Sequence, residues 1–177
     1  LVYNGEIYNH WQLRENLINK GYTFNSKSDT ETLLNSWREW GKDAVKYLNG
    51  IFAFSILDKN ENKLYIVRDR FGVKPLYVYQ KNDSFAFSSE IKALININSF
   101  DPLINYESIV NYLTFLWSPG SHTMYKYVNK LIPGHILEVD IVTLETKSVR
   151  VQKEPIFKGD YWDLSEEEWI KKIDDTL

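Results

Sequence analysis

The amino-acid sequence predicts an α+β fold, in which antiparallel strands pack in layers against helices. Two observations support this prediction. Two consecutive hairpins of apolar strands occupy the middle of the chain, and amphipathic helical segments precede and follow them. The composition agrees, because 44% of the 177 residues are hydrophobic and 15% are aromatic, which is enough for a sizeable core.

The helical segments combine apolar residues at helical spacing with start and stop signals. The first helix is expected over 10–19, with Gly21 as its stop. The second begins at the Ser-Asp-Thr-Glu run 28–31, where Ser28 or Asp29 can cap it. Further helical segments are expected at about 43–48, 90–95, 105–116 and 165–177.

The apolar period changes from helical to strand-like at residue 51. Residues 51–57 and 63–68 flank the polar run 58–62, which indicates a hairpin. Residues 75–79 and 84–88 indicate a second hairpin, with Pro75 at the start of its first strand. The remaining predicted strands are 1–3, 22–24, 134–140 and 146–152.

The charge balance and the missing cysteine exclude several classes of protein. The net charge of −3 gives no basic face for nucleic acid, and no apolar run approaches the ~18 residues of a membrane span. Without Cys there is no disulfide scaffold, thiolate metal site or thiol nucleophile within these residues. The three histidines stand far apart, so no metal site is expected: His10, His122 and His135.

Asn4-Gly5 is the first candidate for chemistry. The dipeptide is typical of a type I′ hairpin turn, and sequence alone favours that interpretation. However, the following residues 6–9 make no returning strand before the first helix. An Asn amide beside a Gly N–H can also form an oxyanion hole, since two donors then converge where charge develops on a carbonyl.

The Ser-Asp-Thr-Glu run at 28–31 is the second candidate. Its structural interpretation is a capped helix N-terminus. Its functional interpretation adds a ligand, because a carboxylate at the start of a helix can hold a substrate ammonium group. The two interpretations are compatible.

The run 68–77 is the third candidate, with several charges around Gly72 and Pro75. Such a run usually forms a solvated turn, in which Gly72 permits an unusual φ. The neighbouring run 58–62 resembles half of a calcium loop, but Lys63 stands where that loop requires Gly, so a calcium site is rejected.

Taken together, Asn4-Gly5, the run 28–31 and the run 68–76 resemble the class II glutamine amidotransferases, in which the same three elements occur in this order. Within that class the chain resembles the asparagine synthetase branch. The motifs typical of this branch are Asn-Gly-Glu-Ile-Tyr-Asn at 4–9, Ser-Ser-Glu-Ile-Lys-Ala-Leu at 88–94, Tyr-Leu-Thr-Phe at 112–115, Lys-Leu-Ile-Pro-Gly-His at 130–135 and Tyr-Trp-Asp-Leu at 161–164.

The resemblance implies a fold and a glutaminase site. The fold is the four-layer αββα sandwich of antiparallel sheets found in N-terminal-nucleophile hydrolases, here expected to be incomplete at the N-terminus. An N-terminal Cys upstream of Leu1 would attack the glutamine amide, with its own α-amino group as base. The Asn4 side chain and the Gly5 N–H would stabilise the oxyanion. Glu6 and Asp29 would help to bind glutamine, with Asp29 on its α-ammonium group.

The resemblance also implies a larger protein around this chain. Residues 1–152 would be a partial glutaminase domain with its C-terminal extension, and 153–177 a linker and the first helix of a synthetase domain. Ammonia would pass to that domain, which uses ATP and Mg²⁺ to activate aspartate, so no cofactor is expected in this chain. Without nucleophile and carboxylate-binding Arg, the fragment is expected to be inactive. A cytoplasmic location is implied, and a homodimer stays open.

Two alternatives remain open at this point. A related amidotransferase could use another carboxylate acceptor, such as a sugar acid, a peptide or an antibiotic precursor. The chain could also be a non-catalytic relic that kept the fold and lost the chemistry.

Overall fold

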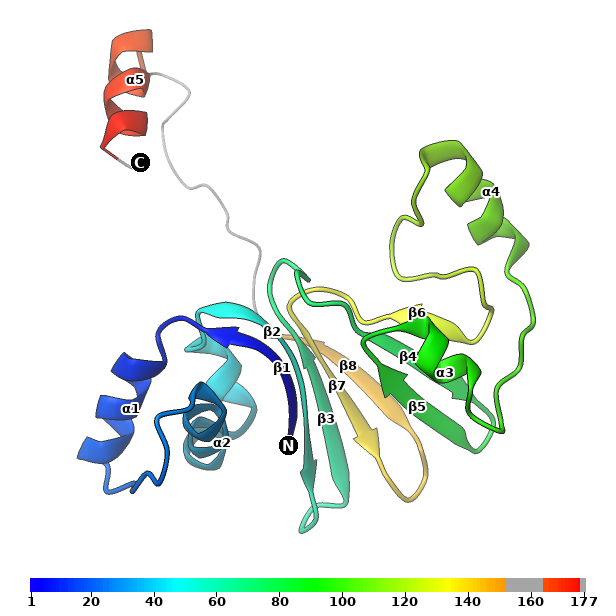
Figure 1. Ribbon diagram of the computed structural model, residues 1–177, viewed down its shortest axis with the longest axis horizontal. Helices are drawn as coiled ribbons and strands as arrows, with labels where there is room; N and C mark the ends of the chain where they lie inside the picture. The colour runs from blue at the N-terminus through cyan, green and yellow to red at the C-terminus, as the bar shows by residue number, and fades with distance from the viewer. Residues whose placement is uncertain (152–163, 176–177) are drawn as a thin grey trace.

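The computed structural model describes residues 1–151 and 164–175, and its strands form two antiparallel sheets (Figure 1). The five-stranded sheet, in the order β1-β2-β3-β7-β8, contains β1 (Val2–Ile7), β2 (Gly50–Asp58), β3 (Lys63–Arg68), β7 (His135–Asp140) and β8 (Thr146–Arg150). The three-stranded sheet, in the order β5-β4-β6, contains β4 (Tyr77–Lys81), β5 (Ser84–Ser88) and β6 (Val128–Lys130).

Both predicted hairpins are confirmed, but they belong to different sheets. The β2–β3 pair has Ala53 opposite Arg68 in the larger sheet, whereas the β4–β5 pair has Tyr77 opposite Ser88 in the smaller one. The last predicted strand pair is also present, as β7 and β8. Pro75 does not start a strand, since β4 begins at Tyr77.

Two helices, α1 (His10–Asn19) and α2 (Asp29–Trp40), cover one face of the five-stranded sheet (Figure 1). They bury Leu13, Leu33 and Trp37 against Phe52 and Phe54 of β2. A 3₁₀ helix, η1 (Gly41–Lys46), follows α2 where a short helix was predicted. The strand predicted at 22–24 is wrong: these residues follow the helix end, where the Tyr22 N–H donates to the Leu17 carbonyl.

The opposite face of the larger sheet packs against the smaller sheet. Ala53 and Ile66 of the larger sheet share a core cluster with Leu76 and Leu131, and Phe87 of β5 packs against that cluster. On the far side of the smaller sheet, the short helix α3 (Ile91–Ile95) buries Leu94 beside Tyr79 and Val128. The order of layers is therefore helix, sheet, sheet, helix, which confirms the expected αββα sandwich.

Two further helices are described: one lies between α3 and β6 in the sequence, and the other follows β8. Asn105 caps α4 (Tyr106–Phe115), whose side chains are mostly exposed; Ser108 is its buried residue. The last described helix, α5 (Glu166–Asp174), lies within the helical segment predicted at 165–177 and begins with a capping box between Ser165 and Glu168. Residues 153–163 of the predicted segment 153–177, which include most of the motif at 161–164, lie outside the described residues.

Candidate functional site

Asn4 and Gly5 lie within strand β1, opposite Ala53 and Phe52 of β2. The strand continues to Ile7, so the type I′ turn interpretation is wrong. Gly5 has φ +153°, and a Cβ built on it would stand 2.2 Å from the Ile51 carbonyl oxygen. The motif therefore needs Gly because two backbones approach too closely for a side chain.

The register of β1 determines where the Gly5 N–H points. The backbone N–H and carbonyl of Phe52 both bond to Asp69, on the side away from β1. Phe52 and Gly5 therefore form a pair without mutual hydrogen bonds, and the Gly5 N–H points away from β2. Because β1 is the edge strand of the described sheet, this donor faces its open edge.

Asp29, the first residue of α2, lies against the same edge of β1. Its Oδ2 accepts hydrogen bonds from the Tyr3 hydroxyl at 2.7 Å and from the Ile7 backbone N–H at 3.1 Å. Ile7 is two residues from Gly5 and has the same orientation in the strand. At this edge of the sheet, the Asp29 carboxylate is therefore bonded to a residue only two positions along the strand from the outward-facing Gly5 N–H.

The cap of α2 is Ser28, whose Oγ accepts from the Thr30 N–H at 3.1 Å. Glu31 organises the preceding loop, since its carboxylate accepts from the N–H groups of Asn25 and Ser26. Hydrogen bonds from Ser26 and Asn25 lower the pKa of Glu31. Ser28 therefore caps the helix, and the Asp29 carboxylate is not used for this cap.

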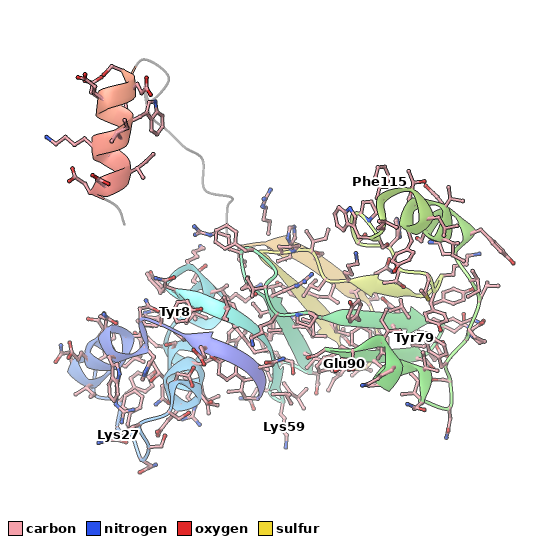
Figure 2. The ribbon with its side chains drawn as sticks, turned by 45° about the horizontal axis from the view of Figure 1, so that its top comes forward. Tyr8, Lys27, Lys59, Tyr79, Glu90 and Phe115 are labelled. Carbon is pink, nitrogen blue, oxygen red and sulfur yellow. The ribbon has the colours of Figure 1, made fainter. Side chains whose placement is uncertain are left out.

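A hollow of about 490 Å³ brings together three of the four predicted site residues, Gly5, Glu6 and Asp29. Two residues of its wall are labelled in Figure 2: Tyr8 directly follows β1, and Lys27 belongs to the loop before α2. The other lining residues are Ile7, His10, Trp11 and Ser28.

Asn4, the fourth predicted residue, projects to the other side. Its Nδ2 donates to Ser89 Oγ at 3.5 Å, and its side chain lines a second hollow of about 450 Å³ between the sheets. Glu90, labelled in Figure 2, belongs to the same wall. Asn4 and Gly5 are consecutive residues of β1, but they border different hollows.

The run 68–77 contains a loop that is held by hydrogen bonds of two charged side chains, Arg68 and Asp69. The solvated-turn interpretation is therefore wrong. Asp69 is 1% exposed, and its carboxylate accepts from the N–H groups of Phe52, Phe71, Val73 and Lys74. The Arg68 guanidinium donates to the carbonyls of Gly72, Lys74 and Leu131, and burial lowers its pKa. The loop thus holds the backbone of Phe52, the residue paired with Gly5, through hydrogen bonds to Asp69.

Two residues near the site were given no role by sequence reasoning. Ser89 stood inside the motif at 88–94, but its contact with Asn4 joins residues far apart in the chain. Tyr3 could have been found by alternation with Gly5 and Ile7, had the strand been extended past Asn4.

Among the described residues, no group of three or more His, Cys, Asp or Glu side chains could hold a metal ion. No helix in the described ranges has the length and apolar character needed to cross a membrane.

The amino-acid sequence is similar to those of known proteins. The chain is 45% identical over 134 residues to glutamine-hydrolysing asparagine synthetase 1 of Bacillus subtilis (strain 168), which covers 76% of the chain and 21% of that protein. It is 34% identical over 166 residues to a putative glutamine-hydrolysing asparagine synthetase of Methanocaldococcus jannaschii, covering 93% of the chain and 30% of that protein. The chain therefore spans less than a third of the length of these relatives.

Solved structures share the fold. The glutamine phosphoribosylpyrophosphate amidotransferase of B. subtilis, complexed with ADP and GMP, has a TM-score of 0.58 at 22% identity, covering 86% of this chain and 29% of that one. A structure described as the allosteric regulatory enzyme of purine biosynthesis has a TM-score of 0.60 at 23% identity, covering 86% of this chain and 28% of that one. At these identities the likeness extends to the fold alone.

The sequence profile of the glutamine amidotransferase domain matches residues 1–150, which include every strand and all the site residues described above. This match covers far more than half of the chain and agrees with both sets of relatives. The chain belongs to the glutamine amidotransferase domain family.

Proposed function

We propose that this chain forms the glutamine-hydrolysing part of an asparagine synthetase. The observation that carries the proposal is the edge of β1, where the outward-facing Gly5 N–H and the Asp29 carboxylate border one hollow. An anion-stabilising donor beside a fixed carboxylate suits a substrate that carries both an amide carbonyl and an ammonium group. Glutamine carries both.

In the proposed reaction, a thiolate attacks the side-chain amide carbon of glutamine, and the tetrahedral intermediate takes up a proton and loses ammonia to leave a glutamyl thioester. Water then hydrolyses the thioester, which releases glutamate and restores the thiol. The Asn4 amide and the Gly5 N–H donate to the oxyanion that forms during attack. The sequence contains no Cys, so the thiolate belongs to a residue outside these 177. We assign it to an N-terminal Cys of the complete protein, with its own α-amino group as base.

Asp29 is proposed to hold the α-ammonium group of glutamine. Its Oδ2 is occupied by Tyr3 and Ile7, and within the described residues its Oδ1 makes no hydrogen bond. A carboxylate with one committed and one uncommitted oxygen can accept a charge-assisted bond from a substrate without losing its own position. Glu6 lines the same hollow and is proposed to contact glutamine as well.

The acceptor chemistry is proposed from the relatives, whose names describe asparagine synthetases. Ammonia would reach a further domain of the same protein, which would amidate aspartate with ATP and Mg²⁺. We place this activity in the cytoplasm, in line with the metabolites it would use, and we leave a homodimer as one arrangement of the complete protein.

The test uses the complete product of the gene and, beside it, the 177-residue chain. The complete protein should release one glutamate from glutamine for each asparagine formed from aspartate and ATP. The 177-residue chain should release none above background, because it has no thiol. Glutamate release by the short chain would overturn the mechanism, and failure of the complete protein to hydrolyse glutamine would overturn the function.

A further inference from the structure

We infer that Tyr3 is a positioning residue for the substrate's ammonium group, acting through the carboxylate of Asp29. This inference rests on the proposed function, in which Asp29 binds that group, and it adds a residue with no role in the mechanism so far. Tyr3 and Asp29 are 26 residues apart, and they meet where β1 passes the start of α2.

The contact has the geometry of a strong hydrogen bond. The Tyr3 hydroxyl donates to Asp29 Oδ2 at 2.7 Å, a short distance that is typical of a bond to a charged acceptor. Burial, together with the neighbouring Asp29 carboxylate, raises the pKa of the Tyr3 phenol well above its ordinary value. The phenol therefore stays protonated at physiological pH and always donates.

Two donors on the same oxygen fix the rotation of the carboxylate. The Ile7 N–H approaches Oδ2 from the strand at 3.1 Å, and the Tyr3 hydroxyl approaches it from a neighbouring side chain. With Oδ2 held at two points, Oδ1 is left as the oxygen for a ligand in the hollow that Asp29 lines. Without Tyr3 a single backbone bond would remain, and the carboxylate could rotate about it.

The backbone explains why Tyr3 reaches this position. Side chains of alternate residues share one face of a strand, so Tyr3, Gly5 and Ile7 point toward the helices. The buried Ile7 anchors that face, and Tyr3 packs against the same core cluster.

The experiment measures steady-state glutamine hydrolysis by the complete protein and its Tyr3→Phe variant. Loss of a hydrogen bond to a charged group should raise the KM for glutamine by about 3- to 10-fold, with kcat nearly unchanged. The KM for glutaramate, which is glutamine without its α-ammonium group, should stay within about 2-fold, because this substrate has no ammonium group for Asp29 to hold. An equal rise in KM for both substrates would overturn the inference.

A double-variant cycle separates this inference from the proposed function. Asp29→Asn should raise the KM for glutamine, and adding Tyr3→Phe to it should raise that KM by no more than about 2-fold. If Asp29→Asn leaves the KM unchanged, the ammonium assignment of the proposed function is wrong. If Asp29→Asn raises the KM and Tyr3→Phe does not, only the role of Tyr3 is wrong.

Tyr65 provides a matched control elsewhere in the same sheet. Its hydroxyl also donates to a carboxylate at 2.7 Å, that of Glu61, and neither residue lines the hollow that contains Asp29. Tyr65→Phe should leave the KM for glutamine unchanged. A rise equal to that of Tyr3→Phe would mean that loss of any such bond loosens the domain, which would overturn the specific role of Tyr3.

Discussion

Replacing Asn4 by Ala separates an oxyanion donor from a structural residue. The side chain is exposed, and its only hydrogen bond to another described residue is the 3.5 Å contact with Ser89 Oγ. The strand is held by backbone pairing with Ala53, which Ala at position 4 preserves. The substitution should therefore change the free energy of unfolding by no more than about 0.5 kcal/mol, as at other surface positions.

The expected kinetic effect is far larger. Removing one oxyanion donor costs about 2.7 to 4 kcal/mol of transition-state stabilisation, so kcat for glutamine hydrolysis should fall by about 10² to 10³. The KM for glutamine should change little, since the donor acts on the tetrahedral state more than on the planar amide. Asparagine formation from free ammonia should survive, because the proposed ammonia-using chemistry lies in another domain.

The assay compares glutamine-driven and ammonia-driven synthesis by the complete protein, together with its thermal unfolding. Asn96→Ala is the matched control, since Asn96 is also exposed and makes one hydrogen bond through Nδ2, to the Lys92 carbonyl. That variant should retain full activity with both nitrogen donors. A parallel fall of both activities in a less stable Asn4→Ala protein would refute the oxyanion assignment.

Two further predictions concern the backbone and the C-terminal helix. Gly5→Ala should lower the unfolding temperature far more than Gly21→Ala. Both glycines have a positive φ, +153° and +94°, which strains Ala at either position, but only at Gly5 does a Cβ also meet Ile51 O, at 2.2 Å, whereas nothing lies within 4 Å at Gly21. Similar losses in thermal unfolding would contradict the close-approach argument. In helix α5 the side chains of Trp169, Ile170 and Ile173 are 40%, 55% and 52% exposed. The backbone amides of α5 in the 177-residue chain should therefore exchange with solvent much faster than those of β2. Equal protection of the two elements would show that α5 packs stably.

Local signals predicted the elements whose structure is decided locally. The helix α2 could be predicted because its cap, Ser28, and its apolar spacing lie within one segment. The β2–β3 hairpin could be predicted because its strands flank a short polar turn. By contrast, β6 has only three residues, Val128–Lys130, and gains its strand conformation from pairing with β4, far away in the sequence.

The site also combines features that depend on local sequence with features that depend on distant contacts. Asn4-Gly5 is locally a good turn, but pairing with β2 outweighs that preference and carries the strand on to Ile7. Resemblance to a family supplied Glu6 and Asp29 as site residues, and the structure places both beside Gly5 in one hollow. No local pattern could supply the contact of Tyr3 with Asp29, because it depends on where α2 meets the sheet.

The outward-facing Gly5 N–H also has a consequence for solubility. An edge strand whose backbone donors stay open is a template for pairing with another chain, and the usual protection is to cover it. Within the 177-residue chain, no other described strand covers this edge of β1. Glu6, the exposed residue next to Gly5, places a negative charge on this strand, and like charges would repel a second copy aligned beside it. In the 177-residue chain, Glu6 should therefore weaken pairing of β1 with a second copy.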